Sequence, residues 1–355
     1  TLVHGCSWTP TVLAGACIAS EETARCVIVH TLIYTLPTPA RNLTHVLLAL
    51  QPDYGDADQW IKPRLKTPIH SVFKLLANPY LVMSEPILFE ACHELIYRIA
   101  AHPTTSRQLF AYLRTNPEDY TLSCLKDLSP FTCQVTDSPA LKASRLMSLS
   151  WFLRTVSIDI RSAEVGSSRS ELDRLTKSLL VQDTPFISRC KALTLFDLLN
   201  VSLPPPTSFT LSIFAGTDWR SCQKPSKRGL MVMEISKLHT LLQRDKDAMQ
   251  KSGRLLPYQP AQVDEEIRNF LQASVQQNAH NNVLGAQCQA YESWIQFTQL
   301  AIITLTKCIS KQETQEALLF ALCGPVLDRI KDSAVNYPIP SLLAPLVLSI
   351  ISRLR

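Results

Sequence analysis

The residue types that do chemistry in enzymes and metal sites occur in this chain without the spacing that such sites need. Eight histidines and eleven cysteines are spread over 355 residues, with no H-E-x-x-H motif and no C-x-x-C pair. A zinc site needs several nitrogen or sulfur ligands that converge at a defined spacing. His93 lies beside Cys92 in an apolar helical pattern, so we interpret it as a packed histidine and predict that the chain holds no metal.

Motifs that bind phosphate or activate a nucleophile are also absent from the sequence. Glycine, which lets a backbone approach a phosphate, accounts for only 9 residues, and neither the P-loop nor the dinucleotide-binding glycine motif occurs. The S-x-x-K strings at 123–126 and 188–191 lack the partner motifs of acylating enzymes. The acidic run Asp264–Glu266 lies at a predicted helix start, where carboxylates interact favourably with the helix dipole. We therefore predict no catalytic residue, no cofactor and no small-molecule substrate, and interpret the chain as a non-enzyme.

The distribution of charge indicates that nucleic acid is not a partner. The net charge is +5 and the pI is about 8.6, but the basic residues are spread along the chain. Nucleic-acid binders usually carry a dense basic stripe instead. We expect the densest basic cluster, Lys224, Lys227 and Arg228, to be a solvated loop.

Cysteine usage and apolar runs indicate a reducing compartment and no transmembrane segment. Most cysteines fall within apolar helical patterns, as buried reduced thiols do. The longest apolar stretch, Leu342–Ile351, is interrupted by Pro345 and is far shorter than the ~18 residues that a membrane span needs. The chain begins at Thr1 rather than methionine, and we expect it to be a piece of a longer protein.

Helical periodicity recurs along most of the chain, and prolines divide it. Between Ser84 and His102, for example, apolar residues recur on one helix face, and Pro103 ends the pattern because the residue before proline avoids the α region. The apolar run Cys26–Ile33 would also suit a strand, but its helical neighbours favour a helix. Similar patterns predict helices over 106–114, 120–128, from Pro139 onward, and over 170–180, 189–199, 231–250, 264–277, 285–309, 313–333 and 341–354.

This succession predicts an all-α fold, an irregular α-solenoid of HEAT or armadillo type in which antiparallel helix pairs stack into a superhelix. One bundle cannot bury roughly a dozen to fifteen helices around a single core, whereas in a solenoid each pair covers only its neighbours. No strand is needed anywhere. We expect one continuous solenoid segment over 1–355, with loops near 51–67 and 201–227, the second of which includes the stiff connector Pro204–Pro206.

Two aromatic pairs, Trp151 with Phe152 and Tyr291 with Trp294, could anchor either a partner or the core. Tryptophan and tyrosine are enriched at binding hot spots. The helical spacing of these pairs within apolar stripes favours core packing. We therefore assign no protein-binding residue, and the binding face stays unknown at this stage.

Stretches in consistent order along the chain resemble the large inner-ring scaffold nucleoporins of the nuclear pore complex, a family of long α-solenoids. The resemblance covers most of the chain from about Ala40 onward and is strongest to the middle part of metazoan members. Between Leu180 and Pro204 this chain is shorter than vertebrate members of the family. The stretches are NLTHVLLAL (42–50), LRTNPEDYTLSCLKDLSPF (113–131), SLSWFLRTVSIDIR (148–161), SRSELDRLTKSLL (168–180), KLHTLLQRDKDAMQ (237–250), VDEEIRNFLQASVQQN (263–278) and AYESWIQFTQLAIITLT (290–306).

The resemblance implies a scaffold at the nuclear envelope that supports the pore's inner ring and nucleocytoplasmic transport. Its partners would be other inner-ring nucleoporins. In this family, linker nucleoporins dock short helical motifs mainly outside the middle segment, so no binding residue is transferred. Two other classes stay open: an importin-like or armadillo-type soluble adaptor, a class that tends to be more acidic than this chain, and a helical enzyme with a dispersed site.

Overall fold

The computed structural model is helical, apart from one short hairpin, over the residues that it describes. These are residues 22–35, 72–73, 75–78, 80–102, 106–115, 120–165, 169–180, 214, 216–228, 230–255, 258–308, 312–320, 323–324, 348 and 352. The expected loop near 51–67, the expected helix over 189–199 and the proline connector at 204–206 lie outside the described residues. So does most of the sequence predicted as helix beyond residue 320.

Prolines and polar turns set the ends of the first helices, as the sequence predicts. The apolar run over 26–33 is helical, within α2 (Glu22–Thr35). Pro86 occupies the first position of α6, where its missing N–H is not needed. The helices of this part are α5 (Leu81–Ser84), α6 (Pro86–Ala101), α7 (Ser106–Thr115), α8 (Tyr120–Lys126) and the 3-10 turn η2 (Ser129–Phe131).

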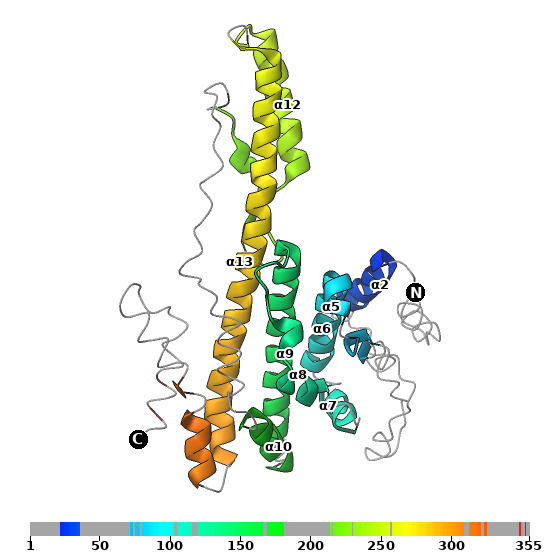
Figure 1. The fold of residues 1–355 in the computed structure, drawn as a ribbon, viewed down its shortest axis with the longest axis vertical. Helices are drawn as coiled ribbons and strands as arrows, with labels where there is room; N and C mark the ends of the chain where they lie inside the picture. Colours follow the sequence, from blue (N-terminus) through cyan, green and yellow to red (C-terminus); the bar gives the residue numbers. More distant parts are fainter. Residues whose placement is uncertain are drawn as a thin grey trace.

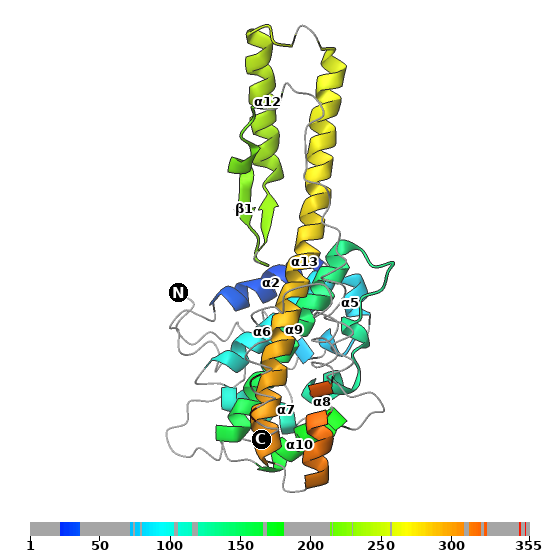
Figure 2. The same cartoon turned by 90° about the vertical axis from the view of Figure 1, so that its left-hand side faces the viewer.

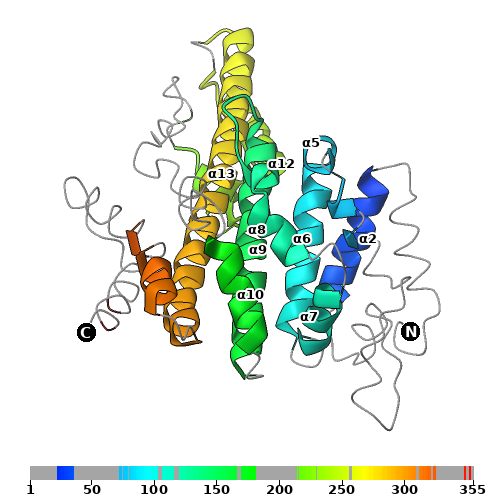
Figure 3. The ribbon, with the colours of Figure 1, turned by 60° about the horizontal axis from the view of Figure 1, so that its bottom comes forward.

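Four helices lie in a row, and each buries one face on the next (Figure 3). α6 packs against α2 on one side and against α9 (Pro139–Val165) on the other, and α9 packs in turn against α13 (Pro260–Cys308). The shorter helices α7 and α10 (Arg169–Leu180) also contact α9. We call this assembly, with residues 286–308 of α13, the body. α9 can be covered on both sides because its apolar residues extend over more than a single helix stripe.

α13 is one continuous helix of 49 residues, where the sequence pattern predicts two helices over 264–277 and 285–309. Between Ala261 and Cys308 the helix contains no proline. Gly285 is tolerated inside the helix because Arg228 fills the space that a side chain would occupy. With a rise of about 1.5 Å per residue, the helix is roughly 70 Å long, and it extends far above the body (Figure 1). The apolar pattern over 264–277 predicts that Val275 faces inward with Ile267 and Phe270, but the structure leaves Val275 50% exposed.

A smaller unit with its own core projects from the body, and we call it the tower (Figure 1). It consists of η4 (Trp219–Cys222), α12 (Ile235–Lys251) and residues 260–271 of α13. α12 ends where the sequence predicts, since Gly253 adopts the positive φ of 71° that suits a helix C-terminus. The buried residues of the tower core are Phe214, Cys222, Met233, Leu238, Leu242, Val263, Ile267 and Phe270.

A two-stranded antiparallel hairpin corrects the expectation that the chain contains no strand. β1 (Gln223–Pro225) pairs with β2 (Met231–Met233), so part of the expected loop over 201–227 has regular secondary structure. The helix expected over 231–250 begins only at Ile235. Side chains of α13 bind the backbone of β2, and local periodicity cannot reveal partners so distant in sequence.

Candidate functional site

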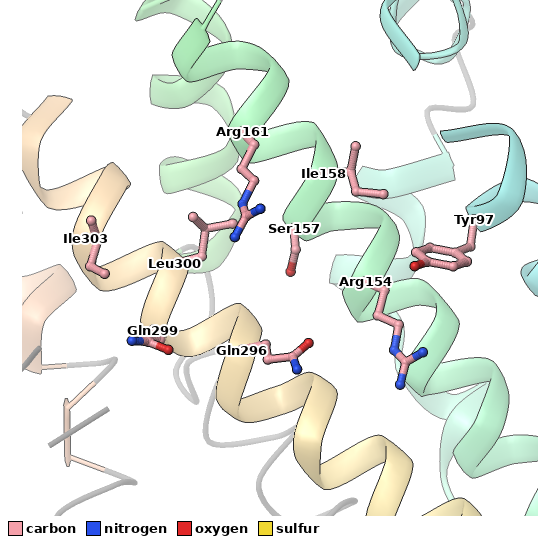
Figure 4. A pocket seen from close by; sticks show the side chains of 9 residues that line it. All are labelled: Tyr97, Arg154, Ser157, Ile158, Arg161, Gln296, Gln299, Leu300 and Ile303. Carbon is pink, nitrogen blue, oxygen red and sulfur yellow. The ribbon is translucent and has the colours of Figure 1, made fainter. Parts of the chain in front are cut away.

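A groove with a volume of about 520 Å³ lies between α9 and α13, and it is the candidate binding site in the described part of the chain (Figure 4). Its two walls come from the two longest helices of the body. Tyr97 of α6 lies at one end, beside Arg154. The lining side chains are Arg154, Ser157, Ile158 and Arg161 from α9, Gln296, Gln299, Leu300 and Ile303 from α13, and Tyr97.

Arg154 connects the two walls of the groove. Its Nε donates to Ser293 Oγ at 2.9 Å, and its Nη2 donates to Gln289 Oε1 at 2.6 Å. One turn earlier on α9, the hydroxyl oxygens of Ser150 and Ser293 lie 2.8 Å apart. Because the acceptors of Arg154 are uncharged, its guanidinium retains an un-neutralised positive charge at the groove.

The first aromatic pair belongs to the core, as the sequence predicts. Trp151 is 9% exposed and Phe152 is fully buried. The guanidinium carbons of Arg98 and Arg154 lie 5.7 and 5.0 Å from the centroid of the Trp151 ring, within the range of cation–π attraction. Trp151 therefore anchors the two arginines rather than presenting a free aromatic face.

The lining of the groove offers groups suited to binding an anion. Its charged lining residues are Arg154 and Arg161, and guanidinium groups bind carboxylates through paired hydrogen bonds. Ser157 Oγ donates to the carbonyl oxygen of Leu153 at 2.8 Å, and among the lining residues that the structure describes there is no histidine or carboxylate that could deprotonate it. The arrangement fits an acidic segment of another chain with some apolar surface.

Sequence reasoning misses this groove, because its residues come from three helices that are far apart along the chain. A weak signal is present in each helix. Arg154 and Arg161 are seven residues apart, as are Gln296 and Ile303, so each pair lies on one helix face. Such spacing identifies a face but not the helix that it meets.

His93 is a packed histidine, as the sequence predicts. Its side chain is buried, its ring lies edge-on to that of Phe89 with centroids 4.6 Å apart, and its Nδ1 lies 2.5 Å from the hydroxyl of Tyr120. Burial lowers the pKa of His93 to about 3, because the charged imidazolium would lose its hydration. The imidazole is therefore neutral at pH 7.

We expect His93 to make the fold sensitive to mild acid. Its pKa is about 3 in the folded chain and about 6.5 in the unfolded chain. Between these pH values the unfolded state binds one more proton, so stability is complete above about pH 6.5 and falls as the pH decreases. At pH 5 the loss should be about 2 kcal/mol relative to pH 7. Urea unfolding at both pH values, followed by circular dichroism, measures it.

Two variants separate this effect from other titrating groups. His93→Phe keeps a flat ring but cannot take up a proton, so its stability should lose about 2 kcal/mol less than that of the parent between pH 7 and pH 5. Tyr120→Phe removes the hydroxyl but leaves the histidine buried, and it should retain the pH dependence of the parent. Equal pH dependence in the parent and His93→Phe would contradict this assignment.

In the basic cluster next to the hairpin turn, Lys224 and Lys227 are exposed to solvent, as the sequence predicts, although Lys224 lies in β1 and not in a loop. Lys224 pairs with a neighbouring carboxylate at 2.5 Å. Lys227 Nζ lies 5.4 Å from the centroid of the Tyr34 ring on α2, and Arg228 Nη2 lies 2.8 Å from a carboxylate oxygen of Glu90 on α6. Lys227 and Arg228 therefore join the hairpin to the body through partners that lie far away in sequence, whereas the partner of Lys224 is Glu234 at the start of α12.

The remaining candidate residues have structural contacts. Asp264, near the start of α13, pairs with Lys246 of α12, and Cys92 and Cys323 are buried. Within the described ranges, no group of three His, Cys, Asp or Glu side chains is placed to hold a metal ion. In the same part of the chain, no helix combines the length and apolarity that crossing a membrane requires.

Comparison with known proteins points to the nuclear pore. The profile of a family described as nuclear pore complex scaffold, nucleoporins 186/192/205, matches residues 17–355. The human nuclear pore complex protein Nup205 is 25% identical to this chain over 326 residues, which cover 81% of this chain. The chain spans 16% of the length of that human protein.

Proposed function

The chain belongs to the family of nuclear pore complex scaffold nucleoporins 186, 192 and 205, which places it in the pore at the nuclear envelope, and we propose that it is one segment of an inner-ring α-solenoid. The proposed role is mechanical. Helices that bury apolar surface on their neighbours form a stiff support, and this support holds other nucleoporins at fixed spacing without turnover of a substrate.

The row of helices α2, α6, α9 and α13 carries this proposal (Figure 3). In a solenoid each unit covers only its neighbours, so a segment leaves apolar side chains open at both ends. At one end, α2 exposes 58% of Val27 and 63% of Tyr34. Beyond α13, the helix over 312–320 exposes 81% of Phe320. We infer that further helices of the longer protein cover these side chains.

We also propose how partners contact this segment. Other inner-ring nucleoporins would meet its exposed faces, and short helical motifs of linker nucleoporins would dock mainly elsewhere in the longer protein. The basic α9–α13 groove is the candidate contact, because it offers Arg161 and two glutamine amides beside apolar side chains. Membership of a scaffold family favours this function over the importin-like or armadillo-type adaptor.

Affinity purification of the tagged full-length protein from cell extract, with chemical cross-linking, tests the proposed function. We expect inner-ring nucleoporins to co-purify, with cross-links from them to this segment. Recovery dominated by Ran and by basic localisation peptides would instead support the soluble adaptor.

A charge reversal tests the groove separately. Arg161→Glu should remove cross-links to the α9–α13 groove, because the variant repels an acidic partner segment. The matched control is Arg244→Glu on the tower, whose side chain is 74% exposed and lies away from the groove. Identical cross-link patterns for both variants would show that no partner uses the groove, while leaving the scaffold function intact.

A further inference from the structure

Between the tower and the body, α13 has a polar stretch, residues 272–285, which we call the neck. The tower core ends at Phe270, and buried apolar residues of the body resume at Ala286. Glutamine, asparagine and histidine predominate in the neck, and none of its hydrophobic side chains is fully buried. No continuous apolar core therefore fixes the direction of the tower relative to the body.

The hairpin runs alongside this neck (Figure 2). The side chain of Asn278 binds the backbone of Met233 twice: its Oδ1 accepts from the N–H at 2.7 Å, and its Nδ2 donates to the carbonyl oxygen at 2.8 Å. Asn281 Nδ2 donates to the carbonyl oxygen of Met231 at 2.9 Å. These amides take the place of a third strand at the edge of β2, so they hold the hairpin to the neck.

The turn of the hairpin then reaches the body. Arg228 forms an ion pair of 2.8 Å with Glu90, and the two side chains are 20% and 19% exposed. Hydrogen bonds between charged groups are stronger than neutral ones, and partial burial protects this pair from solvent. Beside it, Lys227 lies over the ring of Tyr34. Two different helices of the body therefore hold two successive residues of the turn.

Gly285 allows the turn to lie this close to α13. A Cβ at this position would be 2.9 Å from both the Cβ and the carbonyl oxygen of Arg228, closer than side chains pack. Glycine inside a helix costs about 0.5–1 kcal/mol relative to alanine. A packing role accounts for glycine here, because only a missing side chain leaves room for the turn.

We propose that Lys227 and Arg228 of the hairpin turn form a latch that sets the direction of the tower on the body, and that the tower bends at the neck when the latch opens. The upper end of the hairpin belongs to the tower, because Met233 and Cys222 lie in the tower core. Its lower end is held by Glu90 and Tyr34. Opening the Arg228–Glu90 contact leaves both apolar cores intact, so the two units move as rigid bodies.

Electron paramagnetic resonance distance measurements on the full chain test the latch. Spin labels are introduced through genetically encoded ketone residues, because the chain has eleven cysteines. One label replaces Arg244 on the tower, and the other replaces Tyr80, which is 75% exposed on the body. The variants are Arg228→Glu, which repels Glu90, and Gly285→Ala, which displaces the turn by a different route. The control is Arg254→Glu, the same charge change at an exposed position of the tower.

The parent and Arg254→Glu should give one narrow distance distribution. Arg228→Glu and Gly285→Ala should broaden it, and hydrogen exchange of the neck amides should become at least about tenfold faster, which corresponds to about 1.4 kcal/mol. Exchange of the α12 amides should stay unchanged. The latch is refuted by narrow distributions in both variants, by equal broadening in Arg254→Glu, or by loss of protection in α12, which would mean that the tower unfolds rather than bends.

Discussion

Trp294→Ala should lower the free energy of unfolding by about 3–5 kcal/mol, the range for large aromatic side chains truncated in a core. The indole of Trp294 is 0% exposed, on the part of α13 that packs against α9. It stacks on Tyr291, with ring centroids 6.0 Å apart and planes 14° from parallel. Alanine would leave a cavity that the two long helices cannot close, because the core residues around this position hold both helices in place.

Urea unfolding followed by circular dichroism measures this loss, with Phe320→Ala as the matched control. Phe320 is 81% exposed, so its truncation should change the free energy of unfolding by no more than about 0.5 kcal/mol. An unchanged unfolding midpoint for Trp294→Ala would show that the indole is not part of the core. The interpretation of Trp294 as a binding hot spot would then return.

Local signals along the sequence predict the body's first helices well. The ends predicted at residues 102 and 114 lie within one residue of the ends of α6 and α7, and before Pro103 the cause is that proline disfavours the α conformation in the residue that precedes it. The apolar stripes also identify core residues such as Leu95 and Phe152. These features depend on neighbours within a few residues, so the sequence contains the necessary information.

Features that depend on distant contacts are not predictable in the same way. The polar neck interrupts the apolar stripe of α13, so periodicity predicts two helices although the backbone continues. β2 is too short for an alternating pattern, and its backbone partner Asn278 lies 45 residues further along the chain. A signal exists in hindsight: Asn278 and Asn281 are three residues apart on one helix face, as side chains that bind one strand must be.

The candidate groove and the latch fail to appear in the sequence for the same physical reason. Each consists of side chains from several helices, and a helical pattern states which face is apolar without stating what covers it. Arg228 and Glu90 illustrate this limit, because one lies in an apparent loop and the other in an ordinary helix. The two side chains meet only in the folded chain, where α6 packs against α9 and α9 packs against α13. There, Arg228 Nη2 lies 2.8 Å from a carboxylate oxygen of Glu90.

A second large loss of stability should follow from Asp137→Ala, about 3–5 kcal/mol, because this change leaves a buried charge without its partner. Asp137 precedes α9 and lies 3.2 Å from the Nε of Arg145, and the two side chains are only 3% and 5% exposed. The Nη1 of Arg145 also donates to the carbonyl oxygens of Ser129 and Pro130 at 3.2 and 2.7 Å. One guanidinium therefore holds the segment between α8 and α9 against the body.

Two comparisons isolate the buried charge as the cause. Glu94→Ala breaks the exposed pair with Arg98 on α6, and pairs of that kind contribute only about 0.3–0.5 kcal/mol. Combining Asp137→Ala with Arg145→Met removes both charges, so the double variant should be more stable than Asp137→Ala alone, since an apolar replacement of a buried pair is often nearly neutral. A loss for Asp137→Ala no larger than that for Glu94→Ala would mean that the ion pair does not fasten this segment.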